Sequence, residues 1–157
     1  MKILKKILIS VSIVLVISQF FSPEKNNGDI ATVAAFIAET NPPKDVKNIL
    51  ETTCFDCHSA KTTYPWYNAI TPVNYWLNEH IQDGKKHLNF SKWNTYSLKK
   101  KEHKMDELHE EVEEGEMPLN SYTWTHSEAN LSPAQIAAVV AWGKKVQADY
   151  KQQISTK

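Results

Sequence analysis

The sequence contains no arginine: all 18 of its basic residues are lysine, and 18 acidic residues balance them to a net charge of zero. Arginine makes the paired hydrogen bonds to phosphates and base edges on which nucleic-acid recognition depends, usually on a strongly basic surface. Neither feature is present, so we expect no nucleic-acid partner.

The sequence also lacks strand signals. No segment alternates apolar and polar residues for long enough to predict a β-strand, whereas apolar residues recur at helical spacing in several places. We therefore predict an all-α fold, a small domain of about four to five helices preceded by an N-terminal hydrophobic helix.

Cysteine is scarce. The only two, Cys54 and Cys57, stand three residues apart, and His58 follows directly, with Phe55 and Asp56 as spacers. On a helical turn residues i and i+3 lie on the same side, so both thiols can add to the two vinyl groups of one porphyrin edge. The imidazole of His58 can then reach the iron as proximal ligand. The motif predicts one covalently attached haem c, around which the helices would wrap.

Three other interpretations of these cysteines are weaker. A thioredoxin-like redox motif needs a strand leading into it, and none precedes Cys54. A structural zinc site needs four ligands and usually more sulfur, although other histidines are available. A Cys54–Cys57 disulfide would close a very short loop, add little stability and leave His58 without a role.

The N-terminus has the order of an export signal. Lys2, Lys5 and Lys6 precede an uncharged apolar run over residues 7–21. Fifteen helical residues span only ~22 Å, but counting from Ile3 gives a stretch that can cross a locally thinned bilayer. No cleavage site of the A-x-A type follows, so we favour an uncleaved anchor over a cleaved signal peptide.

This pattern divides the chain into three parts. Residues 1–22 are predicted to be the signal peptide or membrane anchor, residues 23–29 a polar linker, and residues 30–157 the haem-binding, cytochrome c-like domain. Haem c is attached outside the bacterial cytoplasm, so we expect a periplasmic domain at the outer face of the cytoplasmic membrane.

Capping signals predict the helices of this domain. Asn41 with Pro42 and Pro43 opens a helix whose last turn carries the cysteine motif. Thr71 and Pro72 open a second helix that is expected to end before Gly84. Its His80 lies near the apolar face and is more consistent with a boundary residue than with an iron ligand.

Two further helices are predicted near the C-terminus. The first, residues 97–114, is highly charged around a narrow apolar seam, and places lysines at its start and glutamates at its end, the reverse of what the helix dipole favours. His103 and His109 fall off the seam, so both are expected to face solvent. Ser132, Pro133 and Gln135 form a capping box that opens the last helix.

The second axial position of the iron has two candidates. Met117, on a loop and stiffened by Pro118, has the form in which a thioether is held against haem iron. Met105 lies in a helical seam, where a core role is expected. His126, nine residues after Met117 in an aromatic loop, is the alternative ligand, and an open position is the third possibility.

These motifs resemble known families. The order of the cysteine motif, Met117-Pro118 and a C-terminal helix is similar to class I cytochromes c. The chain resembles more closely a family of small exported bacterial proteins described as a haem-binding domain, in residues 54–59, 64–67, 72–73, 87–93, 113–118 and 126–132. The resemblance covers about residues 30–150 and implies covalent haem c and an electron-transfer role. Leu119 stands where such sequences often have a second proline, which would leave the loop less rigid.

The sequence therefore predicts a monohaem c-type cytochrome, a one-electron carrier rather than an enzyme. We expect a monomer with protein redox partners, and the acidic run Glu110–Glu116 could attract a basic one. A haem-based peroxidase or a gas or redox sensor is the alternative if Met117 is held loosely. A haem-free interaction module with a Cys54–Cys57 disulfide is the third.

Overall fold

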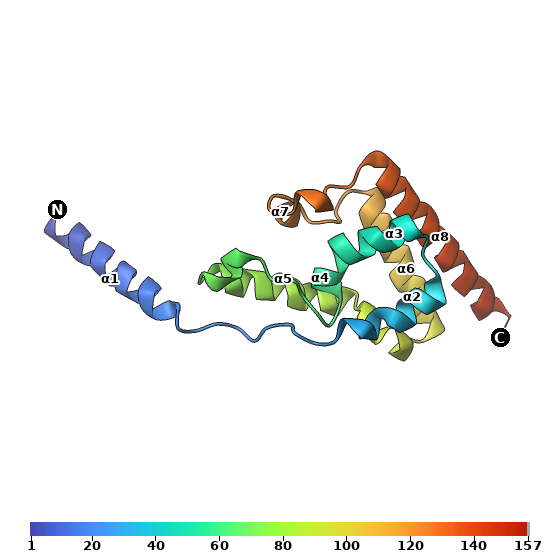
Figure 1. Cartoon of the computed structure of the whole chain (residues 1–157), viewed down its shortest axis with the longest axis horizontal. Helices are drawn as coiled ribbons and strands as arrows, with labels where there is room; N and C mark the ends of the chain where they lie inside the picture. The colour runs from blue at the N-terminus through green and yellow to red at the C-terminus, as the bar shows by residue number, and fades with distance from the viewer. Residues whose placement is uncertain (157) are drawn as a thin grey trace.

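The computed structural model describes residues 1–156 and confirms the all-α prediction (Figure 1). Within these residues there is no β-strand, and extended backbone pairs only in an isolated bridge between Asn27 and Lys61. Figure 1 shows α1 projecting from the remaining helices, which gather into one body.

The helices are shorter and more numerous than predicted. In chain order they are α1 (Lys2–Ser18), α2 (Ala34–Thr40), α3 (Lys44–Ile49), α4 (Phe55–His58), α5 (Val73–His87), α6 (Leu98–Glu113), α7 (Asn120–Thr123) and α8 (Pro133–Ser155). Short 3-10 turns lie at η1 (Ile30–Val33), η3 (Trp66–Ala69), η4 (Phe90–Thr95) and η5 (Ser127–Ala129), and a π turn, η2 (Leu50–Cys54), joins α3 to α4. The predicted number of helices, four to five, is too low because the cysteine motif and the loop after Met117 each contain a separate short helix.

Several predicted helix ends move. Asn41 has a left-handed backbone, φ 40°, and ends α2 instead of opening α3, whose N-cap is Pro43. Pro72 rather than Thr71 caps α5, and Gly84 lies inside that helix rather than beyond its end. The predicted Ser132–Gln135 capping box of α8 is confirmed. Ser97, where the charged helix was predicted to begin, is the N-cap of α6.

An aromatic cluster forms the centre of the core. The ring centroid of Phe36 in α2 lies 4.4 Å from that of Phe90, 5.0 Å from that of Trp93 and 6.0 Å from that of Trp142. Each such pair contributes about 0.5–1.5 kcal/mol beyond the burial of its area. The cluster therefore joins α2, η4 and α8 at one point.

A polar network crosses this core. The Lys101 ammonium on α6 donates to both carboxylate oxygens of Glu39 on α2, at 2.8 and 2.7 Å. The Tyr150 hydroxyl also donates to Glu39, at 2.8 Å, and accepts a 3.2 Å bond from the indole of Trp93. Lys101 is buried. Its position near the start of α6, unfavourable for the helix dipole, is therefore explained by its partner on another helix.

The packing of α6 against α8 corrects one prediction. His109 was expected to face solvent, but it is buried, with Nε2 3.4 Å from the side-chain oxygen of Gln147. A Cβ atom at Gly143 on α8 would lie 2.9 Å from the Cβ of His109, so the glycine lets the two helices approach closely. His103, by contrast, is exposed as predicted.

The apolar N-terminal segment is helical as α1, and its side chains are almost all exposed. Among residues 1–156, no helix combines the length and the apolar character that crossing a membrane requires. The predicted membrane-spanning anchor is therefore not confirmed. After α1, the side chain of Gln19 exchanges two 3.0 Å hydrogen bonds with the backbone of Thr71.

Candidate haem site

The cysteine motif lies where one helical segment ends. Cys54 is the last residue of the π turn η2, and Cys57 and His58 belong to α4. Ser59 then adopts an extended backbone, φ −129° and ψ 179°, which stops the helix directly after His58. Both cysteines are partly buried free thiols, so the predicted placement of the motif on the last helical turn is confirmed and the disulfide has no support.

His58 is oriented for metal binding. Its Nδ1 lies 3.0 Å from the carbonyl oxygen of Leu88, and because a carbonyl can only accept, Nδ1 must carry the proton. Burial lowers the pKa of His58, which favours the neutral imidazole. A neutral ring with Nδ1 engaged by a backbone carbonyl presents its unprotonated Nε2 to a metal, the usual arrangement for a histidine ligand.

Gly84 brings α5 against the motif. A Cβ atom at this position would lie 2.9 Å from the carbonyl oxygen of Cys57 and 3.1 Å from its Cβ. Only a glycine fits this contact without displacing the backbone that carries the thiol. The same approach places Leu88, directly after α5, where its carbonyl meets His58.

The thiols are not activated as nucleophiles. Burial, reinforced by the neighbouring Cys57, raises the pKa of Cys54 to about 12. Burial, reinforced by Asp56, raises the pKa of Cys57 to about 11. Reactive cysteines in redox motifs have lowered pKa values instead. The site therefore does not fit a thioredoxin-like redox motif.

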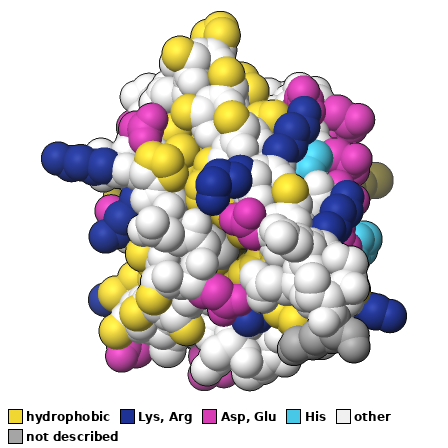
Figure 2. Space-filling model, turned by 90° about the vertical axis from the view of Figure 1, so that its right-hand side faces the viewer, with side chains coloured by type: hydrophobic (Ala, Val, Ile, Leu, Met, Phe, Trp, Pro, Cys, Tyr) yellow, Lys and Arg dark blue, Asp and Glu magenta, His cyan; other side chains and the backbone are white. Residues whose placement is uncertain are grey.

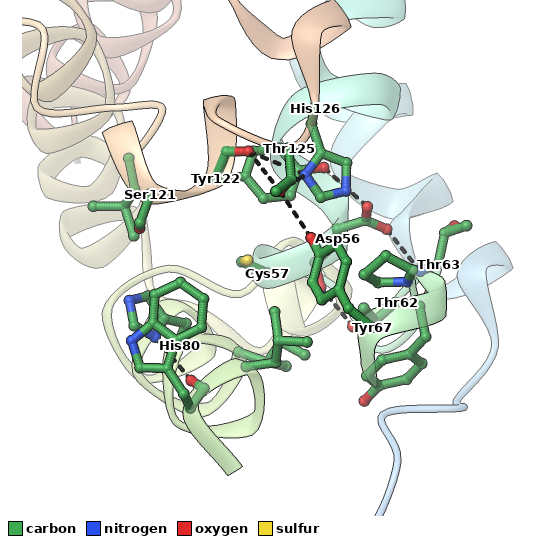
Figure 3. Close-up of a pocket in the computed structure, with 16 residues that line it drawn as sticks. Asp56, Cys57, Thr62, Thr63, Tyr67, His80, Ser121, Tyr122, Thr125 and His126 are labelled. Carbon is green, nitrogen blue, oxygen red and sulfur yellow. Dashed lines mark hydrogen bonds between the residues drawn. The ribbon is translucent and has the colours of Figure 1, made fainter. Parts of the chain in front are cut away.

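A small pocket of about 40 Å³ opens beside Cys57. Its wall comes from α4, the loop after it, α5 and α7. Figure 3 shows Tyr122 and His126 on one side of the pocket, His80 on the other, and Cys57 between them. Residues far apart in sequence thus meet around Cys57, the second cysteine of the motif.

Asp56, predicted to be only a spacer, holds this wall together. Its carboxylate accepts a 3.0 Å bond from the Tyr122 hydroxyl and a 2.8 Å bond from the backbone N–H of Thr63. Burial, with Asp56 next, raises the pKa of Tyr122, so its hydroxyl stays protonated as donor. The acidic residue inside the motif therefore ties both the following loop and α7 to the turn that carries the two cysteines.

His126 lies in the pocket wall. Its ring stacks on that of Tyr122, with centroids 4.0 Å apart and planes 10° apart. Its Nδ1 lies 3.1 Å from the carbonyl oxygen of Tyr122 and 3.2 Å from the Thr125 hydroxyl. These contacts use Nδ1, so Nε2 is the nitrogen that a metal would meet.

Met117 is placed differently. It is partly buried and packs against the hydrophobic core, and its backbone N–H donates to the carbonyl of Glu111 at 3.0 Å. Among the described residues, Leu119 and His126 line the pocket beside Cys57, whereas Met117, Cys54 and His58 do not. The structure therefore brings the runner-up ligand, rather than Met117, into the pocket beside Cys57.

The predicted linker contains a residue that the sequence analysis overlooked. The Asn26 side chain donates to the Ser59 carbonyl at 3.0 Å and to the Thr62 hydroxyl at 2.9 Å, and accepts a 2.7 Å bond from Lys85. The Asn26 backbone N–H donates to the Tyr64 hydroxyl at 2.7 Å. This asparagine thus fixes the loop after the haem motif. Its only sequence signal was membership of a polar, turn-forming stretch.

The donor set fits a covalently attached haem: two free thiols at the i, i+3 spacing, an adjacent histidine with its Nδ1 already engaged, and a glycine that permits close packing against them. Comparison with protein families agrees, since the profile of the haem-binding domain family matches residues 13–145. Searches among curated proteins and among solved structures found no match. Because the match spans most of the sequence, the chain belongs to the haem-binding domain family.

Proposed function

We propose that this protein is a monohaem c-type cytochrome that carries one electron at a time. The observation that carries the proposal is the 3.0 Å contact between Nδ1 of His58 and the carbonyl of Leu88 beside two free thiols. It presents a neutral Nε2 next to the two groups that would attach the porphyrin. Bound haem would supply the one-electron chemistry, which no side chain of this chain provides alone.

Each residue then has a defined role. Cys54 and Cys57 would hold the porphyrin edge as thioethers, and His58 would bind the iron. Met117 is proposed as the distal ligand, because a thioether before a proline on a loop is typical of such cytochromes. His126 is the alternative, supported by its place in the pocket wall with Cys57. The leucine carbonyl at position 88 orients His58.

The proposed location is the periplasmic face of the cytoplasmic membrane. It is supported by the three N-terminal lysines followed by the apolar residues of α1. The proposed partners are redox proteins, and the exposed acidic residues between Glu110 and Glu116 would attract one with a basic surface.

Haem staining after denaturing electrophoresis tests the proposal. The wild-type protein, produced with a haem-attachment system, should keep its stain, because thioether bonds survive denaturation. The double variant Cys54→Ala/Cys57→Ala should lose it, whereas Gln152→Ala, exposed near the far end of α8, should not. An unstained wild type would overturn covalent attachment.

One observation favours a second function. The pocket beside Cys57 is open, and it gathers His80 and His126, whose imidazoles could donate or accept protons. If no side chain holds the distal position, the iron could bind peroxide or a diatomic gas, as in a peroxidase or sensor. Carbon monoxide distinguishes the two, since rapid and complete binding by the reduced protein would count against an electron carrier with two firm ligands.

A further inference from the structure

Charge is absent from the two segments that frame the pocket beside Cys57. Residues 62–78 and residues 117–127 contain no lysine, aspartate or glutamate. Both segments contribute to the pocket wall, and the Tyr67 hydroxyl joins them through a 2.8 Å bond with the Thr125 hydroxyl. We call these two segments together the uncharged rim.

The uncharged rim exposes large apolar side chains. Trp66 and Trp124 are each 81% exposed. Each is next in sequence to a residue that lines the pocket, Tyr67 and Thr125 respectively. Ile70, Tyr75 and Trp76 add further exposed apolar surface, at 42%, 46% and 43%. Exposed tryptophans on an uncharged surface are typical of a contact surface rather than of a face in free solution.

This surface continues into the N-terminal segment. Gln19 is bonded to Thr71 within the uncharged rim, and residues Ser22–Lys25 share a groove with Trp66 and Asn68. Phe20 and Phe21, between these contacts, are 84% and 62% exposed. Figure 1 shows the η3 turn, the start of α5 and α7 at the end of the domain nearest α1.

We infer that the uncharged rim rests on the surface of a lipid bilayer. Tryptophan and tyrosine favour the membrane interface, where a ring lies among acyl chains and its polar atom stays hydrated, whereas a charge placed there is costly. The apolar side chains of α1 enter the same surface, and its lysines fit anionic headgroups. The inference rests on the membrane attachment proposed above and adds an orientation, with the mouth of the pocket beside Cys57 facing the lipid.

Photolabelling from the lipid tests this orientation. The full-length haem-loaded protein is bound to phosphatidylglycerol-containing vesicles that carry a diazirine phospholipid, irradiated, digested and analysed by mass spectrometry. Label is expected in peptides from residues 62–78 and 117–127 as well as from α1, and absent from α6 and α8. Label on α1 alone would overturn the inference and leave a protein as the occupant of this surface. Absence of label everywhere would overturn the membrane attachment itself, while haem staining independently tests the cytochrome.

Two variants sharpen the test. Trp66→Asp/Trp124→Asp places two carboxylates on the uncharged rim and should abolish its labelling while α1 stays labelled. The matched control Gln152→Asp/Gln153→Asp adds the same charge at exposed positions of α8 and should leave the pattern unchanged. An unchanged label on the rim of the Trp66/Trp124 variant would contradict the inference. Unaltered visible spectra exclude misfolding in both.

Discussion

The two ends of the domain differ in the number of charged side chains on their surfaces. At one end, α6 and α8 place both lysine and carboxylate side chains on the surface, and Figure 2 shows both charges on this face. Two of their ion pairs are Lys144–Glu113, with a nitrogen-to-oxygen distance of 2.7 Å, and Lys145–Asp149, at 3.1 Å. At the other end, the uncharged rim surrounds the pocket beside Cys57 with tryptophan, tyrosine and threonine side chains.

This difference indicates that one end of the domain mainly supplies stability and the other mainly forms the haem site. Exposed ion pairs contribute only about 0–1 kcal/mol each, so the charged end is stabilised by what lies beneath it, the aromatic cluster and the Lys101–Glu39 pair. At the haem end, the hydrogen bond that Asp56 accepts and the one that Asn26 donates hold loops in position. We therefore expect substitutions at the charged end to change folding, and substitutions at the haem end to change the haem.

The largest effect is expected at the haem end, from Met117→Ala. If the Met117 thioether is the distal ligand, the weak far-red absorption band of the oxidised protein should disappear completely in the variant. The reduction potential should fall, because a neutral thioether favours the reduced iron. The measurement is the visible spectrum with a redox titration.

His126→Ala is the control for this variant, because it removes the other candidate ligand from the pocket wall. It should keep the far-red band and a potential near that of the wild type. A wild type without the band, together with a spectrum that changes only in His126→Ala, would reassign the ligand to His126.

At the charged end the largest effect is expected from Glu39→Ala. The substitution leaves the buried Lys101 ammonium without its carboxylate and should lower the free energy of unfolding by about 3 kcal/mol. Chemical denaturation measures the loss. The double variant Glu39→Ala/Lys101→Met should recover much of it, because no unpaired charge remains. If Glu39→Ala changed the haem spectrum but not the free energy of unfolding, substitutions at the charged end would not act mainly on folding, as we propose.

Some of this organisation could be predicted from the sequence. The helical class, the Ser132 capping box and the placement of the cysteine motif depend on local spacing, and the structure confirms them. Local signals also misled: Gly84 suggests a helix end, but it serves a contact with Cys57, which lies on another helix.

The remaining features depend on contacts between distant segments. His109 is buried because Gly143 on the facing helix leaves room for it, and no pattern within α6 reveals that. Asp56 looked like a spacer because its partner Tyr122 is 66 residues away. Long-range hydrogen bonds of this kind are not visible in periodicity, so the wall of the haem site had to come from the structure.

The two helix glycines provide a matched pair of smaller perturbations. Gly143→Ala and Gly84→Ala each place a Cβ 2.9 Å from a neighbouring atom, one against His109 and the other against the Cys57 carbonyl. Each should cost about 1–2 kcal/mol, since overpacking outweighs the gain in helix propensity. Thermal unfolding checks both. Only Gly84→Ala should also reduce the yield of stained haem, and equal haem yields would contradict a role for close α5 packing.

The smallest effect concerns the exposed acidic residues between Glu110 and Glu116, at the C-terminal end of α6. If they attract a basic redox partner, the rate of electron transfer to a small cationic redox protein should fall several-fold as salt rises from about 10 to 300 mM, because screening shortens the reach of the attraction. Glu110→Gln/Glu114→Gln/Glu116→Gln should flatten this dependence. The control Glu24→Gln/Glu79→Gln/Asp83→Asn removes the same charge elsewhere on the exposed surface and should leave it steep. A flat dependence in the wild type would remove the acidic run as a docking site for a basic redox partner.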